Sequence, residues 1–126
     1  WASHNIEHEL SALYDVAHGA GLSIVFPAWM KYVYKHNLER FVQFAVRVFG
    51  VEQDFEQPER TVLEGIRRLE AFFNQIGLPT TLSAADIPTD RLEEMAAKCT
   101  DNDRSPVGTF VELKQADVLK IYELCK

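Results

Sequence analysis

The sequence predicts an all-α fold, a multi-helix bundle of about six helices in one domain. Apolar residues recur at intervals of three and four along most of the chain, the spacing that places them on one face of a helix. No stretch with the alternating pattern of a strand is longer than residues 109–113. The chain has 126 residues, of which 47% are hydrophobic and 25% charged, a composition typical of one globular domain with a buried core.

Two helices are predicted at residues 3–14 and 19–35. The first carries an apolar stripe at helical spacing, and the second is apolar on nearly all sides, as expected of a helix buried on several faces. Pro27 is expected to kink the second helix or to begin a new first turn there. Asp15 and Val16 have weak helix propensity, so we expect the chain to turn between the two helices.

Two further helices are predicted at residues 38–49 and 59–76. Asn37 is expected to cap the first of them, because its side chain can accept a hydrogen bond from a free backbone N–H of the first turn. Gly50 and Gly77 are expected to end the two helices, since glycine adopts the left-handed conformation that commonly follows a helix.

The last two helices are predicted at residues 91–98 and 114–125. Thr89 or Asp90 is expected to cap the first of them. A polar loop separates the two helices and lacks the glycine and glutamate spacing of a calcium-binding loop.

Charge and hydropathy argue against two classes of partner. The formal net charge is −6 and there is no basic patch, so neither nucleic acid nor a membrane is an expected partner. No apolar run reaches the roughly 20 residues that span a bilayer. The two cysteines, Cys99 and Cys125, match neither a disulfide framework nor a zinc motif, and we therefore expect a reducing, cytoplasmic setting.

Three of the four histidines, His4, His8 and His18, lie within the first twenty residues. His4 and His8 are four residues apart, so they share one helix face and can direct two ring nitrogens at one ion. His18 lies fourteen residues after His4, which on one continuous helix would separate them by about 21 Å. Because metal–nitrogen bonds are only about 2 Å long, a shared site requires the chain to turn back between Glu9 and His18.

The residues alone leave three interpretations of this stretch open. His4 and His18 could share a mononuclear metal site. Helix geometry allows Glu7 to join it, but a solvated surface glutamate is the favoured interpretation, with further ligands supplied from outside the chain. Residues 4–8 also fit the H-x-x-E-H pattern of inverted zinc peptidases, whose third ligand would be a glutamate in the helix predicted at residues 91–98. Alternatively, the chain is a stand-alone helical binding module whose histidines hold no metal.

The stretch from Trp1 to Pro27 resembles the histidine signature of the iron-containing (group III) alcohol dehydrogenases. It combines two histidines fourteen residues apart, a third between them, and the run of residues 19–27 with its glycines and proline. Within that family the chain is similar to the NAD(P)H-dependent butanol dehydrogenase branch. Residues 117–122, near the end of the chain, are similar to the same branch.

This resemblance implies an oxidoreductase that interconverts primary alcohols and aldehydes, using NAD(H) or NADP(H) and one divalent metal ion, Fe²⁺ or Zn²⁺. It implies that His4 and His18 are two of the metal ligands, while an Asp and a further His lie upstream. It implies that His8 lies beside the nicotinamide and the substrate as a catalytic, cofactor-binding residue that relays a proton. Residues 1–126 are then expected to be the C-terminal helical, metal-binding domain of a two-domain dehydrogenase.

The resemblance also implies the partners. These are a small alcohol or aldehyde and the missing amino-terminal half of the same enzyme, which carries the nucleotide-binding site. Apolar surface exposed where that half would pack favours homo-oligomers of the chain. By the same resemblance Cys99 lies near the substrate cleft, although a plain core cysteine is an equal alternative. The chain alone is expected to be inactive, because it lacks two ligands.

Overall fold

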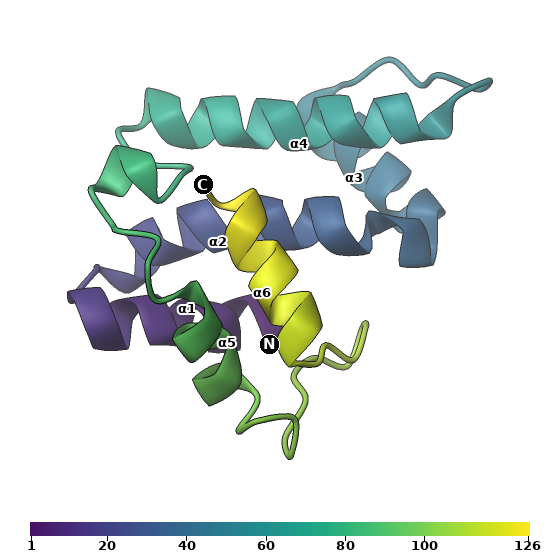
Figure 1. Cartoon of the computed structure of the whole chain (residues 1–126). Coiled ribbons are helices and arrows are strands. Elements are labelled where there is room, and N and C mark those ends of the chain that lie inside the picture. Colours follow the sequence, from purple (N-terminus) through teal and green to yellow (C-terminus); the bar gives the residue numbers. More distant parts are fainter.

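The structure, a computed structural model, describes residues 1–126 as helices joined by loops (Figure 1). The α-helices are α1 (Ala2–Tyr14), α2 (His18–Val33), α3 (Leu38–Phe49), α4 (Pro58–Gln75), α5 (Leu92–Cys99) and α6 (Gln115–Leu124), with short 3₁₀ helices at Tyr34–Asn37 and Ser83–Ala85. The only β pairing is an isolated bridge between Val107 and Leu113. The all-α prediction is therefore confirmed.

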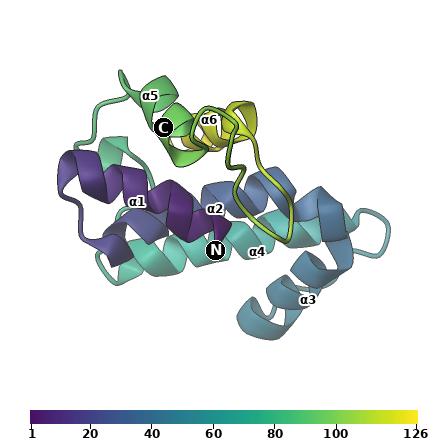
Figure 2. The same ribbon diagram turned by 90° about the horizontal axis from the view of Figure 1, so that it is seen from below.

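Helix α2 lies at the centre of the bundle, between α1 and α4 (Figure 1). It also contacts α6, which pairs with α5, and α5 in turn reaches α1. Figure 2 shows α5 and α6 together on one side of α1 and α2, with α3 at the far end of the molecule. Helix α3 packs against α4. This central position explains why the sequence of α2 is apolar on almost every side.

The core draws buried side chains from all six α-helices. Its largest fully buried apolar side chains include Ile6, Leu10, Ile24, Ile66, Met95, Ile121 and Tyr122. The Tyr122 hydroxyl donates a hydrogen bond to the backbone oxygen of Ile6 at 2.6 Å, which ties the last helix to the first. The two ends of the chain therefore stabilise one another, and α1 is held firmly where it presents its histidines.

Most helix boundaries follow the local signals in the sequence. Asn37 Oδ1 accepts a hydrogen bond from the Arg40 backbone N–H at 3.3 Å, and Gly50 has φ 62°, as predicted for a cap and a stop. Two details differ from expectation. Helix α2 continues through Pro27, so no new helix begins there. Helix α5 starts after Arg91 with no side-chain cap, so the prediction that residue 89 or 90 caps it is wrong.

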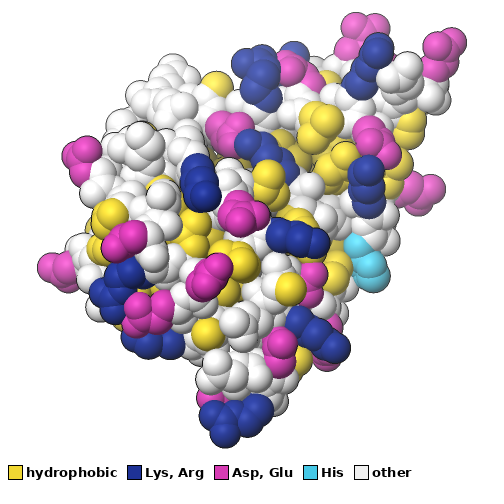
Figure 3. Space-filling view, viewed as in Figure 1, with side chains coloured by type: hydrophobic (Ala, Val, Ile, Leu, Met, Phe, Trp, Pro, Cys, Tyr) yellow, Lys and Arg dark blue, Asp and Glu magenta, His cyan; other side chains and the backbone are white.

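Acidic and basic side chains are interspersed over the face shown in Figure 3. None of the helices combines the length and the apolarity needed to cross a bilayer.

Candidate metal centre

The turn between α1 and α2 brings the separated histidines back together. Helix α1 ends at Tyr14, and Asp15 adopts the left-handed conformation with φ 53° while its N–H bonds to the Ser11 carbonyl at 3.1 Å. Aspartate tolerates this conformation better than most residues. Helix α2 then begins at His18, only four residues after the end of α1. The chain therefore reverses within the segment where the sequence requires it to do so.

The His18 ring lies close to both histidine rings of α1. Its centroid is 5.4 Å from that of His4 and 5.4 Å from that of His8. His4 is half-buried, whereas His8 and His18 are exposed. The juxtaposition of His4 and His18 that a shared ion requires is therefore present. Which of these nitrogens bind a metal stays a prediction.

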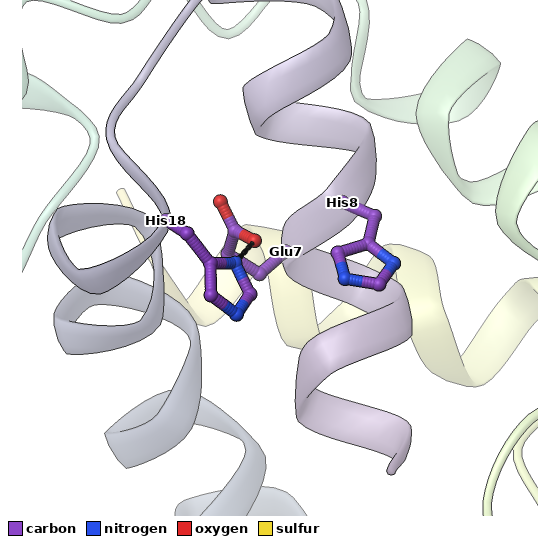
Figure 4. Close-up of side chains that lie close together, drawn as sticks. All are labelled: Glu7, His8 and His18. Atoms are coloured by element: carbon purple, nitrogen blue, oxygen red, sulfur yellow. Dashed lines mark hydrogen bonds and ion pairs between the residues drawn. The ribbon is translucent and has the colours of Figure 1, made fainter.

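Glu7 lies beneath this cluster, and the expectation that it is a solvated surface glutamate is wrong. Its side chain is 0% exposed, Oε2 contacts Nδ1 of His18, and Oε1 accepts a hydrogen bond from the Ser11 hydroxyl (Figure 4). Helix α2 passes so close that a Cβ at Gly21 would overlap the Glu7 carboxylate. The apolar periodicity of the sequence could not reveal the burial of Glu7, because glutamate is polar. The signals that could have indicated it are Ser11, one turn later on α1, and Gly21 on the facing helix.

The donor atoms of this cluster suit a divalent transition metal. With Nδ1 of His18 on the Glu7 carboxylate, the other ring nitrogen points away from it (Figure 4). In His4, Nδ1 lies 3.4 Å from the Ser3 hydroxyl, which leaves Nε2 as the free nitrogen. Imidazole is a preferred ligand of both zinc and iron. The residues present therefore fit such an ion and would supply part of its coordination.

A second combination of donors is also close together. Glu7, His8 and His18 each offer one ligand atom, and these three atoms lie within 4.8 Å of one another. His8 thus lies near the candidate centre, one helical turn after His4, as the resemblance implies. Geometry alone does not separate a role in coordination from a role in proton transfer for His8.

The structure gives the zinc-peptidase interpretation no third ligand. Glu93 is exposed, and Glu94 forms ion pairs with Arg91 at 2.7 Å and Lys98 at 3.1 Å. Hydrogen bonds from these cations lower the pKa of Glu94 to about 2. No glutamate of α5 joins the histidine cluster.

An aromatic cavity of about 360 Å³ adjoins His4. Its apolar lining includes Phe26 and Trp29 of α2, Phe110 of the loop before α6, and Trp1. The Phe26 and Trp29 rings are stacked with their centroids 5.8 Å apart. The Trp29 ring packs on the core but also forms part of the wall of this cavity.

Cys99 is partly buried and packs against the core. Burial, followed by the nearby Glu9 carboxylate, raises the pKa of its thiol to about 12. Cys99 does not line either of the two cavities that contact His4. Within this chain its surroundings are those of a core cysteine.

The sequence is similar to the carboxy-terminal third of known dehydrogenases. The family model for the C-terminal part of the Fe-containing alcohol dehydrogenase family matches residues 1–125. Probable NADH-dependent butanol dehydrogenase 1 of Bacillus subtilis is 44% identical over 121 residues, which are 96% of this chain and 31% of that protein. NADH-dependent butanol dehydrogenase A of Clostridium acetobutylicum is 36% identical over 124 residues, which are 98% of this chain and 32% of that protein.

Solved structures share the fold. The crystal structure of NADH-dependent butanol dehydrogenase A from Thermotoga maritima matches with a TM-score of 0.89 at 39% identity, covering 99% of this chain and 32% of that one. The substrate- and cofactor-free form of the aldehyde reductase YqhD from E. coli matches with a TM-score of 0.91 at 25% identity, covering 100% of this chain and 33% of that one. The chain thus spans about a third of the length of the relatives it matches.

Proposed function

The chain belongs to the Fe-containing alcohol dehydrogenase family, and from that premise we propose that it is the helical, metal-binding part of an NAD(P)-dependent dehydrogenase. The reaction interconverts a primary alcohol and its aldehyde. The observation that carries this proposal is the close approach of the His4 and His18 rings at the turn between α1 and α2. The names of the relatives from B. subtilis and C. acetobutylicum support a butanol-type substrate.

His4 and His18 hold the divalent metal ion in this proposal, with iron favoured over zinc by the name of the family. When bound, such an ion acts as a Lewis acid toward the oxygen of the alcohol or aldehyde. A catalytic metal requires three or four protein ligands, so the remaining ligands come from the other part of the enzyme. The half-buried position of His4 and the turn that carries His18 bring the two ring centroids to 5.4 Å, which supports this pairing.

His8 serves as the proton-transferring residue. It lies one turn from His4 on the same face of α1, its ring centroid is 5.4 Å from that of His18, and its side chain is exposed. Imidazole exchanges protons readily near neutral pH. An exposed imidazole beside the reacting oxygen could accept the hydroxyl proton when an alcohol is oxidised and donate a proton to the oxygen when an aldehyde is reduced. A bound nicotinamide would accept the hydride in the first direction and supply it in the second.

The aromatic cavity beside His4 supports a small apolar substrate. Its lining residues Phe26, Trp29 and Phe110 offer no charged group, and a volume of about 360 Å³ suits a short alkyl chain. An alcohol whose oxygen lies near the histidines could extend its alkyl chain along these rings. The proposed substrate class is accordingly a short unbranched alcohol or aldehyde.

The test of this proposal uses alanine variants of the full-length enzyme. His4→Ala and His18→Ala should lose bound metal and turnover together, because each removes a ligand. His8→Ala should retain the metal and lower kcat on the order of 100- to 10,000-fold, the range typical of a general acid or base. Metal content is measured by elemental analysis and turnover by nicotinamide absorbance.

His36→Ala is the matched control. His36 is the fourth histidine and is exposed in the 3₁₀ helix after α2. Its ring meets that of Phe110, with centroids 5.2 Å apart, so it is the control for metal content, which its removal should leave unchanged. Loss of the metal in His8→Ala would contradict the division of roles. Retention of the metal in both His4→Ala and His18→Ala would overturn the proposed function.

A further inference from the structure

We propose that Glu7 is a positioning residue for His18: its buried carboxylate holds the ring so that Nε2 is the nitrogen presented to the metal. This inference rests on the proposed function, in which His18 is a ligand. It concerns a residue whose burial the sequence did not reveal.

The hydrogen bonds of the cluster define the state of the His18 ring. A carboxylate accepts hydrogen bonds, so the contact with Glu7 assigns the donating role, and hence the proton, to Nδ1 of His18. A neutral imidazole has one protonated and one bare nitrogen, and Nε2 of His18 is then the bare one. A bare nitrogen is what a metal ion needs. Histidine ligands in metal sites commonly donate their other N–H to a carboxylate in this way.

The carboxylate itself is held in place from two sides. The Ser11 hydroxyl, one turn further along α1, hydrogen bonds to Oε1 of Glu7. The backbone of α2 at Gly21 also approaches so closely that any side chain there would overlap the carboxylate. Helix α2 therefore contributes His18 and, three residues later, Gly21, whose missing side chain leaves room for the Glu7 carboxylate.

The two partners of Glu7 explain how a carboxylate can be buried at this position. The Glu7 side chain is 0% exposed, and a buried carboxylate without partners would be costly. Its two oxygens are each engaged, one by His18 and one by Ser11. A carboxylate that contacts the ligand ring also makes the imidazole a stronger electron donor toward a cation.

Direct coordination by Glu7, together with His8 and His18, is the competing assignment. The contacts favour the positioning role. Oε2 faces Nδ1 of His18 and Oε1 is engaged by Ser11, so direct coordination would have to use an oxygen that already accepts one of these hydrogen bonds. The histidine side chains are also exposed, whereas the carboxylate lies fully inside, between α1 and α2.

The first experiment measures the His18 tautomer in this chain without metal. Ring ¹⁵N chemical shifts, recorded by NMR at a pH where imidazole is neutral, should show a protonated Nδ1 and a bare Nε2. Glu7→Ala should give a mixture of tautomers at His18. Glu7→Gln should restore the Nδ1–H form, because the amide oxygen still accepts a hydrogen bond. A wild-type His18 protonated on Nε2 would overturn the proposal.

The second experiment measures Zn²⁺ affinity in the full-length enzyme. Glu7→Ala should weaken binding by about 10- to 100-fold, the usual effect of removing a carboxylate that orients a histidine ligand. Glu7→Gln should lose less affinity than Glu7→Ala. Glu9→Gln, a glutamate on the same helix outside the cluster, is the matched control and should bind as wild type. Thermal unfolding followed by circular dichroism verifies that each variant is folded.

Two results of the affinity measurement would overturn the assignment. Unchanged affinity in Glu7→Ala would show that the carboxylate does not act on the metal site. A loss as complete as that in His18→Ala, with no rescue by Glu7→Gln, would show direct coordination instead. Failure of the proposed function is distinguishable, because His18→Ala would then keep its metal while the tautomer in the metal-free chain still reports on Glu7.

Discussion

The buried polar side chains of this chain differ in whether a hydrogen-bond partner replaces the water that they lose on folding. Glu7 is buried against two partners, whereas the two thiols are buried among apolar side chains. Burial raises the pKa of Cys99 and of Cys125 to about 12 each. The Cys125 thiol is 0% exposed and lies 3.2 Å from the carbonyl of Ile121. Within this chain both cysteines therefore pack with the core.

Both thiols should resist modification in the folded chain. With a pKa of about 12, only about one thiol in ten thousand is ionised at pH 8, and the thiolate is the reactive form. Reaction with Ellman's reagent at pH 8 should therefore be at least about 100-fold slower than in the guanidinium-unfolded chain. Equal rates in the two states would contradict the burial of both thiols.

The same shift predicts a loss of stability in alkali. The folded pKa lies above the unfolded value, so the folded state retains protons that the unfolded state releases above about pH 9. The contribution of the thiols to the free energy of unfolding is complete below pH 9 and declines as the pH rises toward 12. The urea concentration at the unfolding midpoint should decrease as the pH is raised from 8.5 to 10.5. Cys99→Ala should make this decrease smaller, because one of the two thiols is removed.

At the scale of helices, the contact between α3 and α4 depends on the missing side chain of Gly65. A Cβ at Gly65 would overlap the Cβ of Ala45 and lie 2.9 Å from its Cα. Ala45 is 0% exposed and its methyl group has no other rotamer, so only a separation of the two helices could relieve the overlap. The close approach of these helices explains a glycine in the middle of α4, where helix propensity alone would disfavour it.

Gly65→Ala should accordingly destabilise the fold. Helix propensity would favour alanine by about 0.5–1 kcal/mol, but overpacking costs about 1–3 kcal/mol, so the second effect wins. Adding Ala45→Gly should recover part of the loss by restoring the space. Gly19→Ala, where the new methyl group meets nothing within 4 Å, is the control. Urea unfolding measures all three variants, and a Gly65→Ala more stable than the parent would disprove the packing argument.

At the scale of the whole molecule, the chain is about a third of the length of its relatives and supplies two of the proposed ligands. Two imidazoles bind a divalent ion more weakly than the three or four ligands of a catalytic site. Titration calorimetry with Zn²⁺ should therefore give micromolar or weaker binding to this chain and much tighter binding to the full-length enzyme. Sub-micromolar binding by this chain would contradict the half-site, and would indicate that Glu7, His8 and His18 coordinate together.

Local signals in the sequence predicted much of the fold. Asn37 and Gly50 bound α3 as expected, because a cap or a stop depends on hydrogen bonds within a few residues. The turn before His18 was expected from the weak helix propensity of Asp15 and Val16, and a site shared by residues 4 and 18 also requires it. The cap of α5 was mispredicted, because the suitable side chains at residues 89 and 90 form no hydrogen bond with its first turn.

The sequence by itself determined the helical class and favoured the turn, because periodicity and helix propensity act over short distances. That His4 and His18 meet was implied only by the family resemblance, and the structure places their ring centroids 5.4 Å apart. Only the tertiary structure decided that Glu7 is buried against His18 rather than solvated. A glutamate is polar in any sequence pattern, and its burial depends on Gly21 and Ser11 leaving it space and a hydrogen-bond donor. The environment of such a residue comes from a facing helix, whose approach no local pattern specifies.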